Sequence, residues 1–109
     1  MSLRGSLDAS VDDTVQFTFT VRNDGDEPVD LQFADALEAD FAVRDGEREV
    51  WRFSEGRMFA QMIGSESIPP DGTATYEASW EDSESGEYAA VATLEARERD
   101  CKAHAEFSV

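Results

Sequence analysis

The stretch VQFTFTV, residues 15–21, decides the fold class. Its odd-numbered residues are Val or Phe, and its even-numbered residues are Gln or Thr. Because side chains along a β-strand point alternately to the two faces of its sheet, this period of two predicts a strand with one buried and one solvated face. The stretch NDGDEP, residues 23–28, follows directly. Asn, Asp and Gly tolerate positive φ and Pro interrupts strand pairing, so the chain is expected to turn here.

The same period recurs along the rest of the chain. Further apolar rows lie at residues 3–11, 29–33, 39–43, 51–53, 74–80, 88–94 and 101–109. About eight short strands with turn signals between them are typical of an all-β, two-sheet antiparallel sandwich, and no long helical pattern competes with this interpretation. We expect one immunoglobulin-like domain over residues 1–109. Six aromatic residues are expected in its core: Phe17, Phe19, Trp51, Trp80, Tyr88 and Phe107.

One local motif supports an immunoglobulin-like topology. The stretch ESGEY, residues 84–88, resembles a tyrosine corner, in which the tyrosine hydroxyl bonds back to an upstream backbone group. Tyr88 is expected to do so here. Ala90 occupies the position of the second cysteine of antibody domains, and Cys101 is the only cysteine. The core must therefore be held by packing, without a disulfide.

The longest connection, residues 55–72, contains the apolar run RMFAQMI at 57–63. Ser54 is positioned to cap a short helical turn there. Long loops in small sandwiches are uncommon and often functional. Methionines and aromatic residues beside a cation suit a recognition surface. Alternatively, the apolar residues of this run plug one end of the sandwich.

The charge is strongly acidic, with 25 acidic against 9 basic residues, a net charge of −16 and a pI near 4.1. The acidic residues are spread over the whole chain, as expected for a solvated surface. This composition favours a halophilic protein from a salt-accumulating cytoplasm, where molar salt shortens the Debye length to roughly 3 Å and screens the repulsion. An acidic decoy that captures a basic partner is the alternative. Direct nucleic-acid binding is disfavoured.

Neither catalytic nor metal chemistry is apparent. His104 and Cys101 are the only residues of their types, and their spacing of three in a strand predicts opposite faces, with Cys101 inward and His104 outward. Zinc needs four such ligands, and the acidic turn at residues 24–27 lacks the ligand pattern of a calcium loop. The sequence therefore predicts no enzyme and no cofactor or metal.

The sequence has no feature that suggests export or membrane insertion. The opening segment carries Arg4, Gly5 and Asp8 where a signal peptide needs an apolar run. No stretch approaches the ~20 apolar residues of a membrane span. A cytoplasmic protein without membrane contact is expected.

The run ADFAVRDGEREVWRFSEGRMFAQ, residues 39–61, resembles the central motif of the BsuPI-type intracellular proteinase inhibitors. Shorter matches extend the resemblance over residues 15–94: the strand and turn at 17–28, the PDG turn at 70–72 before the strand that ends at Trp80, and SGEY at 85–88, with Ser in place of Pro. The motif positions of the central run are Asp40, Phe41, Trp51, Ser54, Phe59 and Gln61.

The resemblance implies a cytoplasmic β-sandwich that binds and inhibits an intracellular, subtilisin-like serine proteinase. The expected contact residues lie in the long connection: Arg57, Met58, Phe59, Gln61 and Met62. Such a loop either is braced by its own apolar residues and presented like a substrate, or occludes the active site. The alternative function is a non-inhibitory immunoglobulin-like module that binds another protein or assembles with itself.

Overall fold

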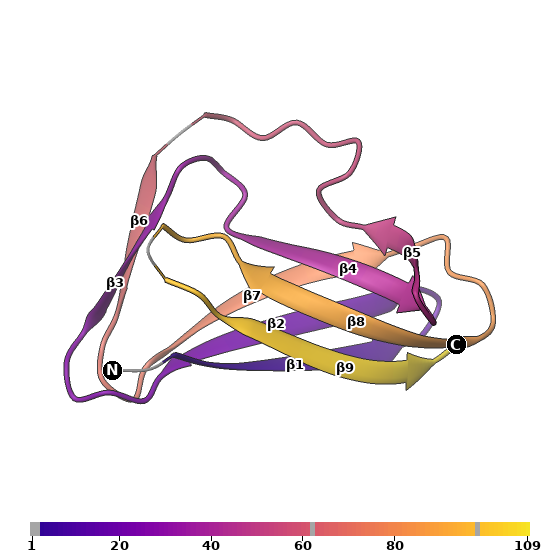
Figure 1. Ribbon diagram of the computed structural model, residues 1–109, viewed down its shortest axis with the longest axis horizontal. Helices are drawn as coiled ribbons and strands as arrows, with labels where there is room; N and C mark the ends of the chain where they lie inside the picture. The colour runs from indigo at the N-terminus through magenta and orange to yellow at the C-terminus, as the bar shows by residue number, and fades with distance from the viewer. Residues whose placement is uncertain (1–2, 62, 98) are drawn as a thin grey trace.

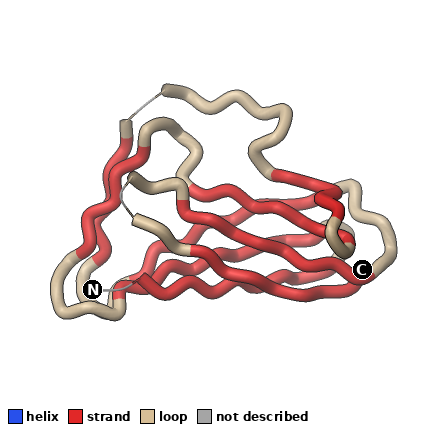
Figure 2. Tube along the Cα trace, in the orientation of Figure 1, coloured by secondary structure: helices blue, strands red, loops and turns tan. Residues whose placement is uncertain are grey.

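Nine strands make up the regular structure of the computed structural model, which describes residues 3–61, 63–97 and 99–109 (Figure 1). Figure 2 shows strands and loops but no helix in these residues. Accordingly, no described segment is a helix long and apolar enough to cross a membrane. The strands are β1 (Leu3–Val11), β2 (Val15–Asn23), β3 (Val29–Phe33), β4 (Ala39–Asp45), β5 (Arg48–Arg52), β6 (Gly64–Ile68), β7 (Thr73–Trp80), β8 (Glu87–Leu94) and β9 (Lys102–Ser108).

The strands form two packed antiparallel sheets and a separate two-stranded ribbon. One sheet has the order β1-β2-β7 and the other β5-β4-β8-β9, whereas β3 pairs with β6. Phe33, at the end of β3, also forms an isolated antiparallel bridge with Ala96. The β3–β6 ribbon stands at one end of the sandwich and carries the chain between the sheets in both directions, from β2 to β4 and from β5 to β7 (Figure 1). The predicted all-β antiparallel sandwich is confirmed.

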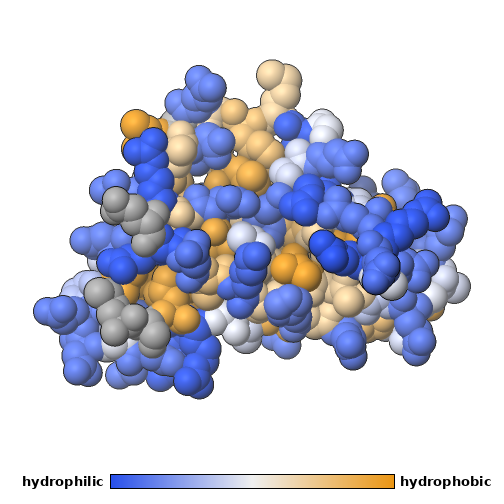
Figure 3. Space-filling model, viewed as in Figure 1, coloured by the Kyte–Doolittle hydropathy of each residue, from blue (hydrophilic) through white to orange (hydrophobic). Residues whose placement is uncertain are grey.

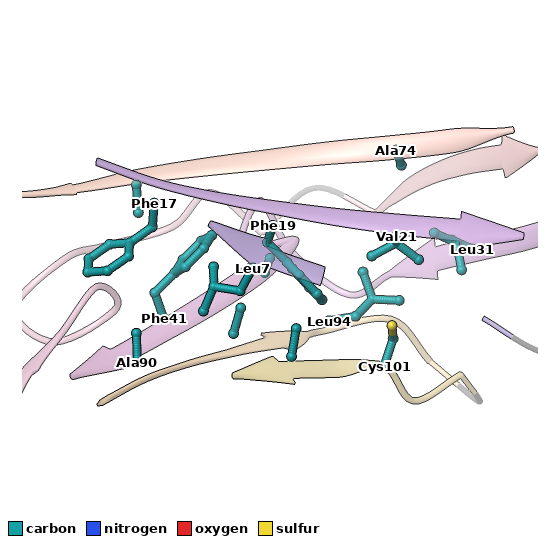
Figure 4. Packing of buried hydrophobic residues seen from close by; sticks show 14 of the residues in the cluster. Leu7, Phe17, Phe19, Val21, Leu31, Phe41, Ala74, Ala90, Leu94 and Cys101 are labelled. Atoms are coloured by element: carbon teal, nitrogen blue, oxygen red, sulfur yellow. The ribbon is translucent and has the colours of Figure 1, made fainter. Parts of the chain in front are cut away.

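The core lies between the two sheets, where the alternation of the sequence buries one side of each strand. Phe17 and Phe19 of β2 are fully buried and lie 6.3 Å and 6.4 Å, between ring centroids, from Phe41 of β4. Figure 4 shows side chains of the first sheet pointing toward those of the second. Burying an apolar side chain of this size contributes about 1.5–3 kcal/mol, so β2 is a principal source of stability.

Three of the six predicted core aromatics occupy the edge of the core instead. Phe17, Phe19 and Trp80 are buried, as predicted. Trp51, Tyr88 and Phe107 are only partly buried and pack against the core cluster. Their rings form a chain around Trp80, which is 6.2 Å from Trp51 and 5.1 Å from Tyr88 between centroids. These large rings cover the open end of the sandwich, and one edge of each therefore remains in solvent.

The long connection differs from the prediction in two respects. It contains β6, which was not predicted because only Ile68 of its five residues is buried. The prediction of a short helical turn is also wrong. Instead, the Glu55 N–H donates to the Arg52 carbonyl at 3.2 Å and the Arg57 N–H donates to the Ser54 carbonyl at 3.3 Å, forming two successive turns that do not continue as a helix.

The predicted tyrosine corner and the predicted faces of Cys101 and His104 are confirmed. The Tyr88 hydroxyl donates to the Glu84 carbonyl at 2.8 Å. Cys101 is buried and His104 is exposed.

A Cβ on Gly5 would lie 2.9 Å from Cys101 Sγ, so β1 approaches the C-terminal segment too closely for a larger residue. This contact closes one side of the sandwich.

Candidate functional site

A buried carboxylate lies beneath the long connection. Asp40, at the start of β4, is 6% exposed and is the only buried acidic residue in the described part of the chain. Its Oδ1 accepts hydrogen bonds from the N–H groups of Phe41 at 2.9 Å and Ser54 at 3.1 Å. Its Oδ2 accepts from Ser54 Oγ at 2.6 Å and from Arg52 Nη1 at 3.0 Å. Four donors thus satisfy one buried anion, which ties the end of β5 and the turn after it to β4.

Arg52, the counter-ion of Asp40, also pairs with an acidic residue at the surface. Arg52 also donates from Nη2 to Glu49 Oε1 at 2.7 Å. Hydrogen bonds to Glu49 and Asp40 raise the pKa of Arg52, so its guanidinium stays charged. The pKa of Glu95 is raised, mainly by burial and to a smaller extent by the negative charge of the neighbouring Asp40. Within the described ranges, no three His, Cys, Asp or Glu side chains converge as metal ligands would. The bonds of Asp40 to Ser54 and Arg52 connect β4 to the end of β5 and to the turn that follows it.

The chain after β5, which we call the 53–61 loop, is organised around the ring of Phe53. The Arg57 guanidinium carbon lies 4.5 Å above the centre of this ring, and the centroid of Phe59 lies 6.2 Å from it. Phe53 itself packs edge-on against Phe41, with 6.0 Å between centroids, and its N–H donates to the Phe41 carbonyl at 2.8 Å. Phe53 thus connects the 53–61 loop to the core of the sandwich.

Met58 lies between the two residues that contact Phe53, and its side chain is 100% exposed. Beyond it, the Ala60 carbonyl accepts a hydrogen bond from the Ala36 N–H at 2.9 Å. The 53–61 loop is therefore fixed to the sandwich before and after Met58, while Met58 itself projects into solvent. The full exposure of this large apolar side chain on an anchored loop makes Met58 a candidate contact residue.

Hollows in the surface flank the 53–61 loop on the side of β7. One, with a volume of about 500 Å³, includes Trp51, Phe53 and Trp80 in its lining. Another, of about 310 Å³, includes Phe59 and Tyr76. Both hollows have aromatic rings and carboxylates in their linings, and both include Glu77 of β7. Figure 3 shows hydrophilic side chains over much of one face of the molecule, with apolar surface between them.

The predicted site residues separate into two groups. Arg57, Met58 and Gln61 are exposed on the 53–61 loop, and Phe59 is half-buried against the scaffold. Met62, the fifth predicted contact residue, lies outside the described residues. The other motif positions lie beneath or beside the loop rather than on its exposed surface: Asp40, Phe41, Trp51 and Ser54.

Sequence reasoning assigned no role to Arg52 and did not place Phe53 at the centre of the loop. Both lie between Trp51 and Ser54, two positions of the family motif, and are not themselves motif positions. Arg52 supplies the counter-ion of Asp40, and Phe53 supplies the ring on which the loop rests. The spacing of an aromatic residue two positions after Trp51, on the same strand face, was the available signal for Phe53.

Similar solved structures share the sandwich architecture at low sequence identity. Spo0M, a sporulation control protein from Bacillus subtilis, matches with a TM-score of 0.59 at 17% identity, over 100% of this chain and 49% of that protein. A CARDB domain from Pyrococcus furiosus, solved in complex with di-metal ions, matches with a TM-score of 0.53 at 13% identity, over 99% of this chain and 87% of that one. The chain spans about half the length of Spo0M, and these likenesses show the fold alone.

A β-glucosidase from Kluyveromyces marxianus, solved in complex with glucose, contains a similar region. The TM-score is 0.52 at 13% identity, over 99% of this chain but only 14% of the enzyme. The same sandwich therefore occurs as one part of a much larger protein. No curated protein matches this chain by sequence.

The family comparison is more specific than the fold. The model of the family described as BsuPI, intracellular proteinase inhibitor, matches residues 3–99. This range includes β1 to β8, the Asp40 cluster and the whole 53–61 loop. The chain belongs to the BsuPI family of intracellular proteinase inhibitors.

Proposed function

We propose that this protein inhibits a subtilisin-like serine proteinase of the cytoplasm by binding it through the 53–61 loop. The observation that carries the proposal is the exposure of Met58 between two neighbours, Arg57 and Phe59, that are both anchored on Phe53. Membership of an intracellular proteinase inhibitor family supports a proteinase as the partner, and the geometry of the loop supports this loop as the contact.

Met58 suits a contact that is made in concentrated salt. Most of the described acidic residues are exposed. Electrostatic attraction between exposed charges is screened at high ionic strength, whereas burial of an apolar side chain persists. Burying Met58 would contribute about 1.5–3 kcal/mol, with Arg57 and Gln61 placed to form part of the polar rim.

The bracing of the 53–61 loop lowers the cost of binding. A loop that is already held in its bound shape loses less conformational entropy on association. Disulfides often provide this rigidity, but the only cysteine, Cys101, is buried elsewhere in the core. Here Asp40, Phe53 and the Ala36–Ala60 hydrogen bond hold the loop. In this proposal the protein acts by binding and performs no catalysis of its own.

The test is a titration of proteinases of different mechanistic classes with the purified protein in 2 M KCl. A subtilisin-like serine proteinase should lose activity toward a small peptide substrate, with an end point near equimolar inhibitor. Cysteine and metalloproteinases assayed in parallel should retain activity. Full activity of several subtilisin-like proteinases at tenfold molar excess of inhibitor would refute the proposed function, provided that circular dichroism shows folded inhibitor.

A further inference from the structure

We propose that the 53–61 loop binds as a substrate does, with the Met58 side chain in the primary specificity pocket and the Met58–Phe59 peptide bond at the catalytic serine. This inference rests on the proposed function and specifies how that function is performed. It assigns a specificity-determining residue, and it excludes the alternative in which the protein merely covers the active site.

The first argument is the alternation of side chains across Met58. Arg57 and Phe59 both fold back onto the ring of Phe53, while Met58 points fully into solvent. Side chains alternate in this way along an extended backbone, and Met58 and Phe59 lie beyond the turn at residues 53–56. Serine proteinases select the residue before the cleaved bond by inserting its side chain into a pocket. An extended segment that projects one side chain away from its scaffold meets this requirement.

The second argument is that both sides of the Met58–Phe59 bond are held independently. On the N-terminal side, the Arg57 N–H donates to the Ser54 carbonyl, and Ser54 is held by Asp40. On the C-terminal side, the ring of Phe59 packs on Phe53 and the following carbonyl, that of Ala60, is hydrogen-bonded. Cleavage would therefore leave two new chain ends fastened to the same scaffold.

This arrangement accounts for inhibition in place of turnover. When the catalytic serine attacks the Met58 carbonyl carbon, the catalytic histidine accepts the proton of the serine hydroxyl and an ester forms with the serine oxygen. The bond to the Phe59 nitrogen breaks, and the released amine takes this proton from the histidine. Because Phe59 is anchored, its amine stays beside the ester at high effective concentration. It can attack the ester and restore the peptide bond, which competes with hydrolysis by water.

Met58 also indicates the class of proteinase. Its side chain is long, unbranched and apolar, so it fits a wide hydrophobic pocket and offers no charge to a pocket with an acidic floor. Proteinases that cleave after large apolar residues are the expected targets, and those that require Lys or Arg are not.

The test compares variants in which only the exposed side chain changes: Met58→Leu, Met58→Phe, Met58→Gly and Met58→Lys. Their inhibition constants for the subtilisin-like proteinase should follow the kcat/KM values of peptide substrates that carry the same residue before the cleaved bond. Met58→Gly should bind roughly 10- to 100-fold more weakly than the wild-type protein, because the apolar burial is lost. Met58→Lys should gain inhibition of a trypsin-like proteinase. Identical substitutions at the exposed Val50 of β5 serve as controls and should change neither value.

Mass spectrometry after prolonged incubation supplies a second readout. A single cut is expected, with fragments 1–58 and 59–109 that remain associated until the protein is unfolded. Inhibition constants that are the same across the Met58 series, or a first cut at another bond, would overturn the substrate-like mode while leaving inhibition itself in place. Loss of inhibition in every Met58 variant, without the substrate correlation, would also overturn it in favour of occlusion.

Discussion

Ser54 Oγ lies 2.6 Å from Oδ2 of the buried Asp40 carboxylate, and this contact joins two segments that are 14 residues apart in the sequence. The hydroxyl and the N–H of Ser54 both donate to the carboxylate, so the turn after β5 is held at one residue by two bonds. Asp40 and Ser54, two positions of the sequence motif, therefore brace the 53–61 loop from the start of β4.

Asp40→Ala should destabilise the fold by about 2–4 kcal/mol, because it leaves buried donors and the Arg52 guanidinium without their shared acceptor. Glu49→Ala is the matched control, since it removes the solvent-exposed partner of the same arginine, at 2.7 Å, and should cost less than about 1 kcal/mol. Urea unfolding in 2 M KCl measures both variants. Equal losses would show that Asp40 is not the central element of the brace.

Asn23→Asp should destabilise the protein by about 3 kcal/mol at neutral pH. The buried Asn23 Nδ2 donates to the carbonyls of Glu27 at 2.7 Å and Ile68 at 2.9 Å, while Oδ1 accepts from the Gly25 N–H at 2.9 Å. In the Asp variant, the Gly25 N–H still has its acceptor, but the oxygen that replaces Nδ2 faces two carbonyl acceptors. Gln32→Glu adds the same charge at an exposed position of β3 and is the control, with a change below about 0.5 kcal/mol expected. A loss as small as that of the control would argue against the hydrogen bonds seen at Asn23.

Tyr88→Phe should lower the free energy of unfolding by about 1 kcal/mol through loss of the 2.8 Å bond to the Glu84 carbonyl. The other tyrosine provides the comparison. The Tyr76 hydroxyl contacts the exposed Glu66 carboxylate at 3.2 Å, so Tyr76→Phe should cost less. Denaturant unfolding of the two single variants, with unchanged m values, decides the order, and the reverse order would contradict the structural role of the corner.

The sequence was most informative where the apolar period was strong. The alternation around Phe17 predicted a core strand, and the ESGEY motif predicted the tyrosine corner. β6 was missed because Gly64, Ser65, Glu66 and Ser67 carry no apolar signal, and its pairing comes from β3. Element assignment by periodicity depends on such a signal.

The candidate site required tertiary information. The helical turn expected after Ser54 does not form, because Asp40, distant in sequence, binds the hydroxyl that was expected to cap it. The exposure of Met58 follows from two contacts to the Phe53 ring, and no local pattern encodes them. The sequence predicted contact residues in this connection without separating them, and only the structure distinguishes the exposed Met58 from Phe59, which packs on Phe53.

Stability should rise with salt, since the net charge is −16 and most acidic side chains are exposed. The midpoint of urea unfolding is expected to be higher in 2 M than in 0.1 M KCl. A variant with Asp12, Asp13, Glu81 and Asp82 replaced by their amides should gain stability mainly at 0.1 M KCl. Identical wild-type midpoints at the two salt concentrations would contradict the halophilic interpretation of the composition.

The most direct measurement of the central claim is the inhibition constant of Met58→Asp against the subtilisin-like proteinase, in 2 M KCl, beside Val50→Asp. Both substitutions place a carboxylate at an exposed apolar position, with Met58 100% and Val50 38% exposed, so both variants should remain folded. If the 53–61 loop is the inhibitory contact, Met58→Asp should bind about 100-fold more weakly than the wild-type protein, and Val50→Asp should inhibit like the wild-type protein. Folded Met58→Asp with wild-type inhibition would contradict the account and place the inhibitory surface elsewhere.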